Sequence, residues 1–311
     1  NMIYQTIIDN TDHQVRVGTS FQYDNFNELV AAQQFDRNEW VPGIFGEYTY
    51  KRSEKFSALI GGRADYHNNF GIFFTPRVNI RYAPDQKTVI RMAAGRGQKT
   101  ASIFAENIGI FASNREIIVE NQNDDTPYGL QAEVAWNFGL SLTKEISIGK
   151  RMLSVSLDLN RIDFTNQIVI DLDRSARQVI FYNLKGQSYS NSAQLQTEID
   201  ATDWLDIRLA YRYNDVKTTY GEQLLQKPLV SPQRAFANVV LKPGKGWNFD
   251  YTINRLSSVR IPSTVANDAE HRWPDQSPSY FLSNAQISKT WKGNFEMYFG
   301  GENIFNYRLE H

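Results

Sequence analysis

The feature that most constrains this chain is a strict alternation of bulky apolar and polar side chains, which recurs in one segment after another. In the clearest case the apolar set is Leu205, Ile207, Leu209, Tyr211 and Tyr213, and the intervening set is Asp206, Arg208, Ala210, Arg212 and Asn214. Segments 136–143 and 247–254 repeat the pattern. Because successive side chains of a strand point to opposite faces, each segment predicts a strand that is long enough to cross a bilayer when tilted. The pattern is typical of a barrel wall with lipid on one face and a wet lumen on the other.

Composition excludes several other classes of protein. No apolar run reaches about 18 residues, so no transmembrane helix is predicted. Aromatic residues make up 13% of the 311 residues, with 19 Gly and only 10 Pro, which favours β-structure. The formal net charge is -1, with 33 Lys+Arg and 34 Asp+Glu and no block of like charge, so no nucleic-acid partner is predicted.

The turns predicted between these segments fall into two sizes that mostly alternate. Tight turns rich in Gly, Pro, Asp or Lys are expected at 10–12, 52–55, 84–86, 149–151, 202–203, 243–246 and 291–293. The links between them are mostly long and irregular, at 24–40, 101–133, 221–233 and 262–279, with two short ones at 67–70 and 173–177. This asymmetry predicts an antiparallel up-and-down barrel, of which about 14 strands are present.

Three tryptophans lie beside tight turns. Trp204, Trp247 and Trp291 would all lie at the same end of the sheet, where they are expected to form an aromatic belt at the membrane interface. The alternative is that each tryptophan only covers a hairpin end in a soluble sheet.

Several motifs carry a resemblance to a known family. The segment Gly300-Gly301-Glu302-Asn303-Ile304-Phe305-Asn306 resembles the G-x-E-N-L-F-N segment near the C-terminus of TonB-dependent outer-membrane receptors. Segments 74–82 and 89–97 look like the hairpin of the same family, with the pattern P-R, R-Y-x-P and R-x-x-x-G-R-G. Segments 106–115, 182–189 and 227–229 resemble the branch found in Bacteroidetes. These motifs occur in the order that the family has, from about Phe74 to Arg308.

The resemblance implies a barrel of roughly 22 strands that is occluded by an N-terminal plug domain. Residues 1–308 are expected to form part of that barrel, about 14 strands of it. The plug domain, the TonB box, the final strand and about seven earlier strands are expected to lie outside this sequence. The outer strands, near 3–8 and 295–306, would then expose unpaired N–H and C=O groups. Residues 309–311, Leu-Glu-His, are typical of the start of a purification tag.

The resemblance also implies a function, which is uptake of a scarce nutrient across the outer membrane. The cargo stays open among ferric siderophores, cobalamin, other metal complexes and glycans. The expected partners are outer-membrane lipid, the plug domain of the same full-length protein, TonB acting through that plug, and a small-molecule or chelate ligand. No catalytic activity and no cofactor is predicted.

Ligand-contacting residues are expected in two long polar loops. In 101–133 the candidates are Glu106, Asn107, Arg115 and Glu116, and in 262–279 they are His271, Arg272 and Trp273. The alternative for Glu106 and Arg115 is that they pair with each other and only hold the loop. Strand parity assigns five arginines to the lumen, where they would face the plug in the whole receptor: Arg77, Arg81, Arg91, Arg208 and Arg212.

The sequence gives little support for a metal site or a catalytic site. The chain has four histidines, none of them paired at metal-ligand spacing, and no cysteine, so no metal site is predicted. The carboxylates are spread through loops and strands, so no catalytic pair stands out. Two alternatives remain open: a passive porin-like or adhesin barrel, and a soluble all-β carbohydrate-binding domain whose aromatic faces would be buried.

Overall fold

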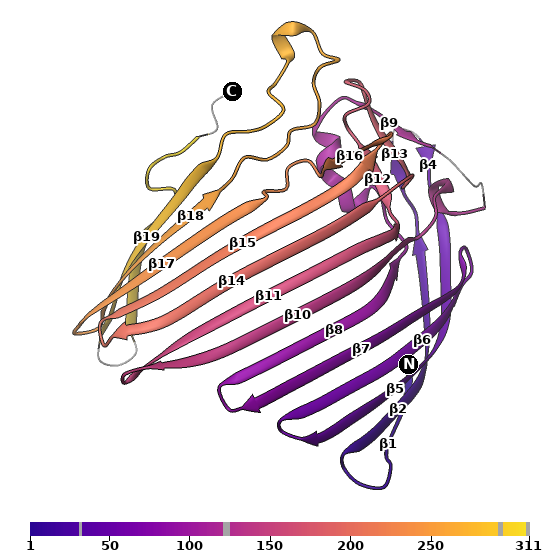
Figure 1. The fold of residues 1–311 in the computed structure, drawn as a ribbon. Coiled ribbons are helices and arrows are strands. Elements are labelled where there is room, and N and C mark those ends of the chain that lie inside the picture. The colour runs from indigo at the N-terminus through magenta and orange to yellow at the C-terminus, as the bar shows by residue number, and fades with distance from the viewer. Residues whose placement is uncertain (31–32, 121–124, 292–294, 309–311) are drawn as a thin grey trace.

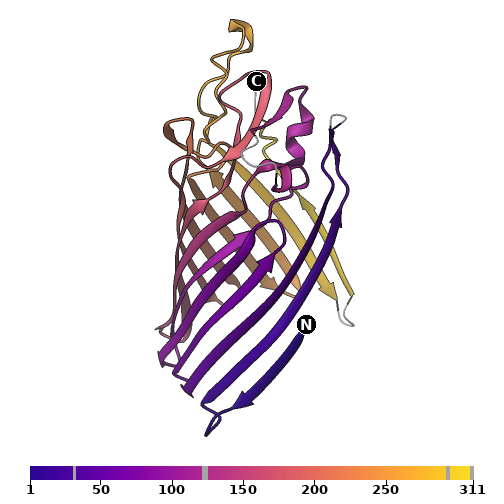
Figure 2. The same ribbon diagram turned by 90° about the vertical axis from the view of Figure 1, so that its right-hand side faces the viewer.

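A computed structural model describes residues 1–30, 33–120, 125–291 and 295–308. Its main element is a single 15-stranded antiparallel sheet that curves around a hollow (Figures 1 and 2). In sheet order the strands are β1 (Met2–Ile7), β2 (His13–Phe26), β5 (Arg37–Ser53), β6 (Phe56–His67), β7 (Gly71–Asp85), β8 (Thr88–Lys99), β10 (Glu133–Ile148), β11 (Arg151–Asn166), β14 (Ser188–Thr202), β15 (Leu205–Tyr220), β17 (Gln233–Gly244), β18 (Trp247–Leu256), β19 (Tyr280–Trp291) and β20 (Phe295–Gly301), with the short β16 (Gln223–Gln226) beside β15.

The predicted up-and-down topology is confirmed. Neighbouring strands of the main sheet pair in antiparallel register, and six of the seven tight turns join them at one end, the lower end in Figure 1. The seventh, 291–293, lies partly outside the described residues, although β19 and β20 pair across it. Among the described residues β1 and β20 each pair on one side only, so the sheet is open and its edges are the two expected ones.

The loop end is more ordered than the sequence predicts. The expectation of a short link at 173–177 was wrong, because this segment is the tip of a separate hairpin, β12 (Ile168–Asp171) and β13 (Gln178–Asn183), inserted between β11 and β14. The loop 101–133 is also not irregular throughout. The ordered elements outside the main sheet are η1 (Ala105–Ala112), β9 (Glu116–Val119), η2 (Pro127–Gly129), the small hairpin of β3 (Leu29–Val30) and β4 (Gln33–Gln34), and η3 (Ala269–His271).

The two faces of the main sheet differ as the alternation predicts. Register pairs connect one polar row across the sheet, in the order Arg81, Arg91, Ser141, Asp158, Gln194 and Arg212. Arg77 and Arg208 have the same parity as Arg81 and Arg212, so all five predicted arginines share this face. Arg208 donates to Glu198 over 2.7 Å, and Arg77 pairs with Glu47. Polar groups therefore satisfy one another on this face; that it faces a plug stays a prediction.

Burial is the reverse of that in a water-soluble protein. Large apolar side chains of the sheet are exposed, including Phe74 and Phe281, and Leu209 is 48% exposed. The apolar core lies instead in the loops, where Val179 and Phe181 are fully buried. An exposed apolar face of this extent fits contact with lipid, because monomeric soluble proteins rarely carry one. None of the helices in the described residues is long and apolar enough to cross a membrane.

We expect Leu209→Arg to destabilise barrel assembly of the full-length protein by roughly 2–4 kcal/mol if position 209 lies near the bilayer midplane. The neighbouring substitution Arg208→Leu changes the polar face, where its partner Glu198 is half exposed to water, and it should be tolerated better. A membrane-assembly assay compares the two. Equal tolerance at both positions would refute the assignment of the faces.

Candidate ligand-binding site

Two connections at the loop end fold together into a unit that we call the loop cap, made of the described residues of 101–132 and 167–187. Its centre is a three-stranded sheet in the order β12-β13-β9, in which β13 and β9 run parallel. Ile103, Phe104, Leu130, Val179 and Phe181 form its buried core. These residues come from segments far apart in sequence, so the burial of apolar surface joins the two loops into one structure.

A buried arginine attaches the loop cap to the wall. Arg37, at the start of β5, is only 7% exposed and donates to Glu39 over 2.8 Å and to Glu28 over 2.6 Å. It also donates to Ser102 over 2.8 Å and to the Tyr128 hydroxyl over 2.6 Å, both in the loop cap. Arg37 belongs to the polar face by its parity with Glu47. The polar face is therefore the one over which the loop cap lies, at the mouth of the hollow in Figure 2.

Tyr128 is held in a conformation that non-glycine residues rarely adopt. Its φ is 57°, in the left-handed region, which costs on the order of 1–3 kcal/mol. Its hydroxyl accepts from Arg37 and donates to Glu28, and its ring packs against Phe35 and Phe104. Burial, together with the bond to Glu28, raises the pKa of the Tyr128 hydroxyl, so it stays a neutral donor.

A second arginine fastens the loop cap to the loop after β18. Arg260 makes two bonds to the Asp173 carboxylate, of 3.1 and 2.9 Å, and Asp173 also accepts from the backbone N–H of Ser263 over 2.6 Å. Arg260 also donates to the carbonyl of Gln226, at the end of β16, over 2.6 Å. This bidentate pair is mostly buried, which makes it more specific than a surface ion pair.

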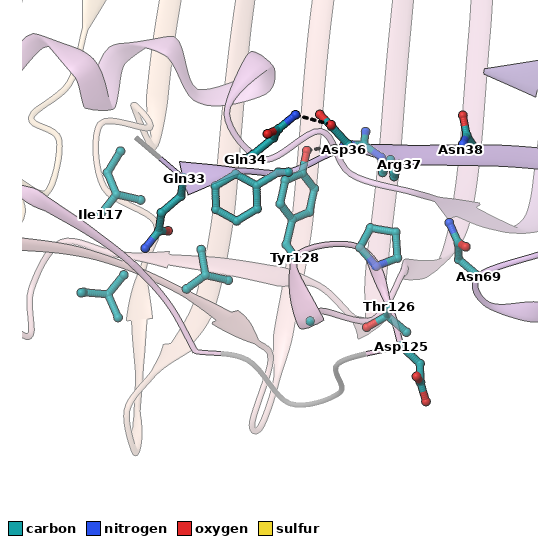
Figure 3. Close-up of a pocket in the computed structure, with 15 residues that line it drawn as sticks. Gln33, Gln34, Asp36, Arg37, Asn38, Asn69, Ile117, Asp125, Thr126 and Tyr128 are labelled. Atoms are coloured by element: carbon teal, nitrogen blue, oxygen red, sulfur yellow. Dashed lines mark hydrogen bonds between the residues drawn. The ribbon is translucent and has the colours of Figure 1, made fainter. Parts of the chain in front are cut away.

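Between the loop cap and β4 lies a cavity of about 630 Å³, within the range of small-molecule sites. Figure 3 shows Gln33 and Ile117 at one end of it, Asn38 and Asn69 at the other, and Tyr128 between them. Its polar lining includes four neutral amide side chains and the carboxylates of Asp36 and Asp125. Among the described lining residues Arg37 is the only cation, and it is already paired with two carboxylates. The charges of the described lining therefore disfavour anionic ligand groups.

None of the seven predicted ligand-binding residues lines this cavity. The suggestion that Glu106 and Arg115 pair with each other was wrong, because Glu106 pairs with Lys99 and Arg115 donates to the carbonyl of Leu172 over 3.2 Å. Asn107 donates to the carbonyl of Ile103 over 2.7 Å, and Glu116 accepts from Gln178 over 2.9 Å. All four stabilise the loop cap in this structure. A ligand-binding role for them stays a prediction.

The other candidates lie elsewhere. His271, Arg272 and Trp273 are exposed in and after η3, on the loop that projects furthest from the sheet in Figure 1. Trp204, Trp247 and Trp291 are exposed at the tight-turn end, and the Lys289 ammonium lies 4.9 Å from the ring centroid of Trp247. Both roles, ligand binding and interface belt, stay predictions. The described residues contain no cluster of metal-ligating side chains.

Sequence reasoning missed the residues that organise this site. Arg37 bonds to groups 65 and 91 residues away, and no local pattern marks such a contact. Tyr128 follows a proline in a polar stretch, which only indicates a turn.

A curved antiparallel sheet with one apolar and one polar face, tight turns at one end and packed loops at the other defines the wall of a membrane β-barrel. The chain matches the family described as "TonB dependent receptor-like, beta-barrel" over residues 4–304. It therefore belongs to the TonB-dependent receptor β-barrel family. A search of curated proteins found no match.

Solved structures of receptors share this fold at low sequence identity. A variant of the ferric enterobactin receptor PfeA of Pseudomonas aeruginosa has a TM-score of 0.70 and 12% identity over 98% of this chain and 48% of the receptor. The siderophore receptors PirA of Pseudomonas aeruginosa and PiuA of Acinetobacter baumannii have TM-scores of 0.65 and 0.62, at 12% and 14% identity, over 99% and 97% of this chain and 53% and 50% of theirs. The chain thus spans about half the length of these receptors. The Bacteroidetes branch stays a prediction.

Arg37→Leu should loosen the loop cap by about 3–5 kcal/mol, because it leaves Glu28 and Glu39 as buried carboxylates without their cation. Limited proteolysis of 101–132 measures the effect. The matched control is Arg174→Leu. Arg174 pairs with Glu120 over 2.6 Å near the surface, and this ion pair should contribute roughly 0–1 kcal/mol to stability. Similar protease resistance of both variants would contradict the role of Arg37.

The loop cap should also lose stability at high pH. Burial raises the pKa of the Tyr182 hydroxyl from its ordinary 10.0 to about 12. Between these values the unfolded tyrosine loses its proton and the folded one keeps it, so stability is full below the lower value and falls as pH rises toward the upper one. In Tyr182→Phe, proteolysis of 167–187 should accelerate less over this window than in the wild type. If proteolysis of Tyr182→Phe showed the same pH dependence as that of the wild type, the loss of stability would not come from Tyr182.

Proposed function

We propose that this chain forms barrel wall and outer ligand-binding loops of a TonB-dependent receptor that imports a scarce nutrient across the outer membrane. The observation that carries the proposal is the loop cap, in which separate loops pack over the polar face and enclose a cavity. The membership in the receptor family supports it. Several of the similar solved structures are siderophore receptors, and two of them are complexes of PfeA variants with enterobactin, which supports a siderophore or another chelate as the class of cargo.

In this function the two faces have different tasks. The apolar face contacts outer-membrane lipid, and the polar face, with Arg77, Arg81, Arg91, Arg208 and Arg212, contacts the plug domain of the full-length protein. TonB acts through that plug. The chain is a transport component with no catalytic role. A passive porin-like barrel would need an open lumen, whereas the loop cap lies over one end of the polar face.

The test is uptake by the full-length receptor in a strain that lacks it. Phe181→Ala should reduce uptake, because removing a fully buried aromatic side chain costs about 3–5 kcal/mol of packing in the loop cap. The matched control is Phe299→Ala, at a side chain that is 80% exposed, which should leave uptake unchanged. Deletion of TonB should abolish uptake in all cases. Uptake that continues without TonB would overturn the proposal in favour of a passive barrel.

A further inference from the structure

Among the described residues, the strand β9 has one unpaired edge, and that edge lines the cavity. In the sheet β12-β13-β9 the strand pairs only with β13. Glu116 donates from its backbone N–H to the carbonyl of Arg177, and Glu120 donates to that of Phe181, each over 2.8 Å. Because backbone groups along a strand alternate in direction, the N–H and C=O groups of Ile117 and Val119 point to the other side. Ile117, Ile118 and Val119 all line the cavity.

The side chains of β9 pack against two apolar clusters. Ile117 and Val119 pack against the core that contains Val179 and Phe181, and Ile118 packs on the opposite face against Val169 and Ile180. Among the described residues no hydrogen bond reaches the backbone of Ile117 or Val119 from any other group. What β9 offers a ligand is therefore its main chain, a row of alternating donors and acceptors.

Side-chain amides on the other side of the cavity from β9 can also form hydrogen bonds with a peptide backbone. The side-chain amide of Gln33, at the same end of the cavity as Ile117 in Figure 3, has no hydrogen bond to another described residue. The amide nitrogen of Asn69 at the other end is also unpaired within the described chain, although its oxygen accepts from Asn68. Amides both donate and accept, and so do peptide groups.

Charge argues against an anionic chelate as the group bound here. A ferric catecholate complex is negative, since its deprotonated oxygens outnumber the charges on the iron. The described lining contains the carboxylates of Asp36 and Asp125. Its only cation is Arg37, which already forms ion pairs with Glu28 and Glu39. A neutral, extended, amide-rich group fits better.

We propose that the free edge of β9 pairs with an extended peptide backbone of the ligand, which adds a fourth strand beside β9. This inference rests on the proposed function and narrows its ligand class. With 4 residues in β9, the paired segment is about four residues long, roughly 13 Å. Main-chain hydrogen bonds of this kind supply affinity with little demand on side-chain identity. A free peptide and a peptide-based metal chelate both provide this backbone.

Equilibrium dialysis against the purified full-length receptor tests the proposal without TonB. The probes are a mixture of end-capped tetrapeptides, the same mixture with N-methylated amides, and a ferric hydroxamate complex built on a tetrapeptide. We expect the receptor to retain the first probe or the third and to release the N-methylated one, because methylation removes the donors. Retention of the ferric probe alone identifies a chelate as the source of the backbone.

Val119→Pro removes one donor of the free edge while the bonds to β13 remain, and it should weaken binding of the retained probe roughly three- to tenfold. Val119→Thr keeps the backbone donor and a side chain of similar shape, and it should bind like the wild type. Failure to retain either unmethylated probe, or equal retention of the methylated peptides, would overturn this inference. Such a result would leave TonB-dependent uptake, and with it the proposed function, intact.

Discussion

The structure depends on one constraint: each backbone N–H and C=O in the wall must bond to a neighbouring strand, because lipid offers no partner. In the described residues antiparallel pairing runs from β1 to β20, with register shifts at a few places, such as between Lys51 and Ser53, and it leaves the two outer edges open. Once the backbone hydrogen bonds are formed, apolar and polar side chains can alternate between the two faces of the sheet. Apolar groups such as Leu209 can then face lipid, while Arg208 and Glu198 bond to each other on the polar face.

The loop cap differs from the wall in that its apolar side chains are buried inside it. Its residues lie beyond the loop end of the wall, and they form an ordinary buried core around Phe181 and Val179. Two buried arginines, Arg37 and Arg260, join this core to the wall and to the neighbouring loops. Their partners are carboxylates, so the ion pairs fix geometry without leaving a positive surface. The cavity beside β9 is a result of this arrangement, since the loop cap presents a strand edge opposite β4, the start of β5 and the turn after β6.

The wall could be predicted from sequence and the loop cap could not. Period-2 alternation is local, so the strand around Leu209, the hairpin of β7 and β8 and the parity of all five arginines follow from short segments. The loop cap is built from distant contacts. β9 pairs with β13, and Gln178 bonds to Glu116 across 62 residues of sequence. Loop 101–133 was recognised as important by its length, but its polar residues proved to hold the loop, while Arg37 and Tyr128, which no pattern distinguishes, organise the cavity.

The central claim is that the odd-numbered residues of β15 face lipid and the even-numbered ones face the polar interior of the barrel. Spin labels at Leu209→Cys and Tyr211→Cys, compared with Arg208→Cys and Arg212→Cys, test it in the full-length receptor in bilayers. We predict that labels at the first pair are more accessible to dissolved oxygen, which concentrates in lipid, than to a water-soluble nickel complex, and that labels at the second pair lack this preference. The same preference at all four positions, or the reverse order, would contradict the account.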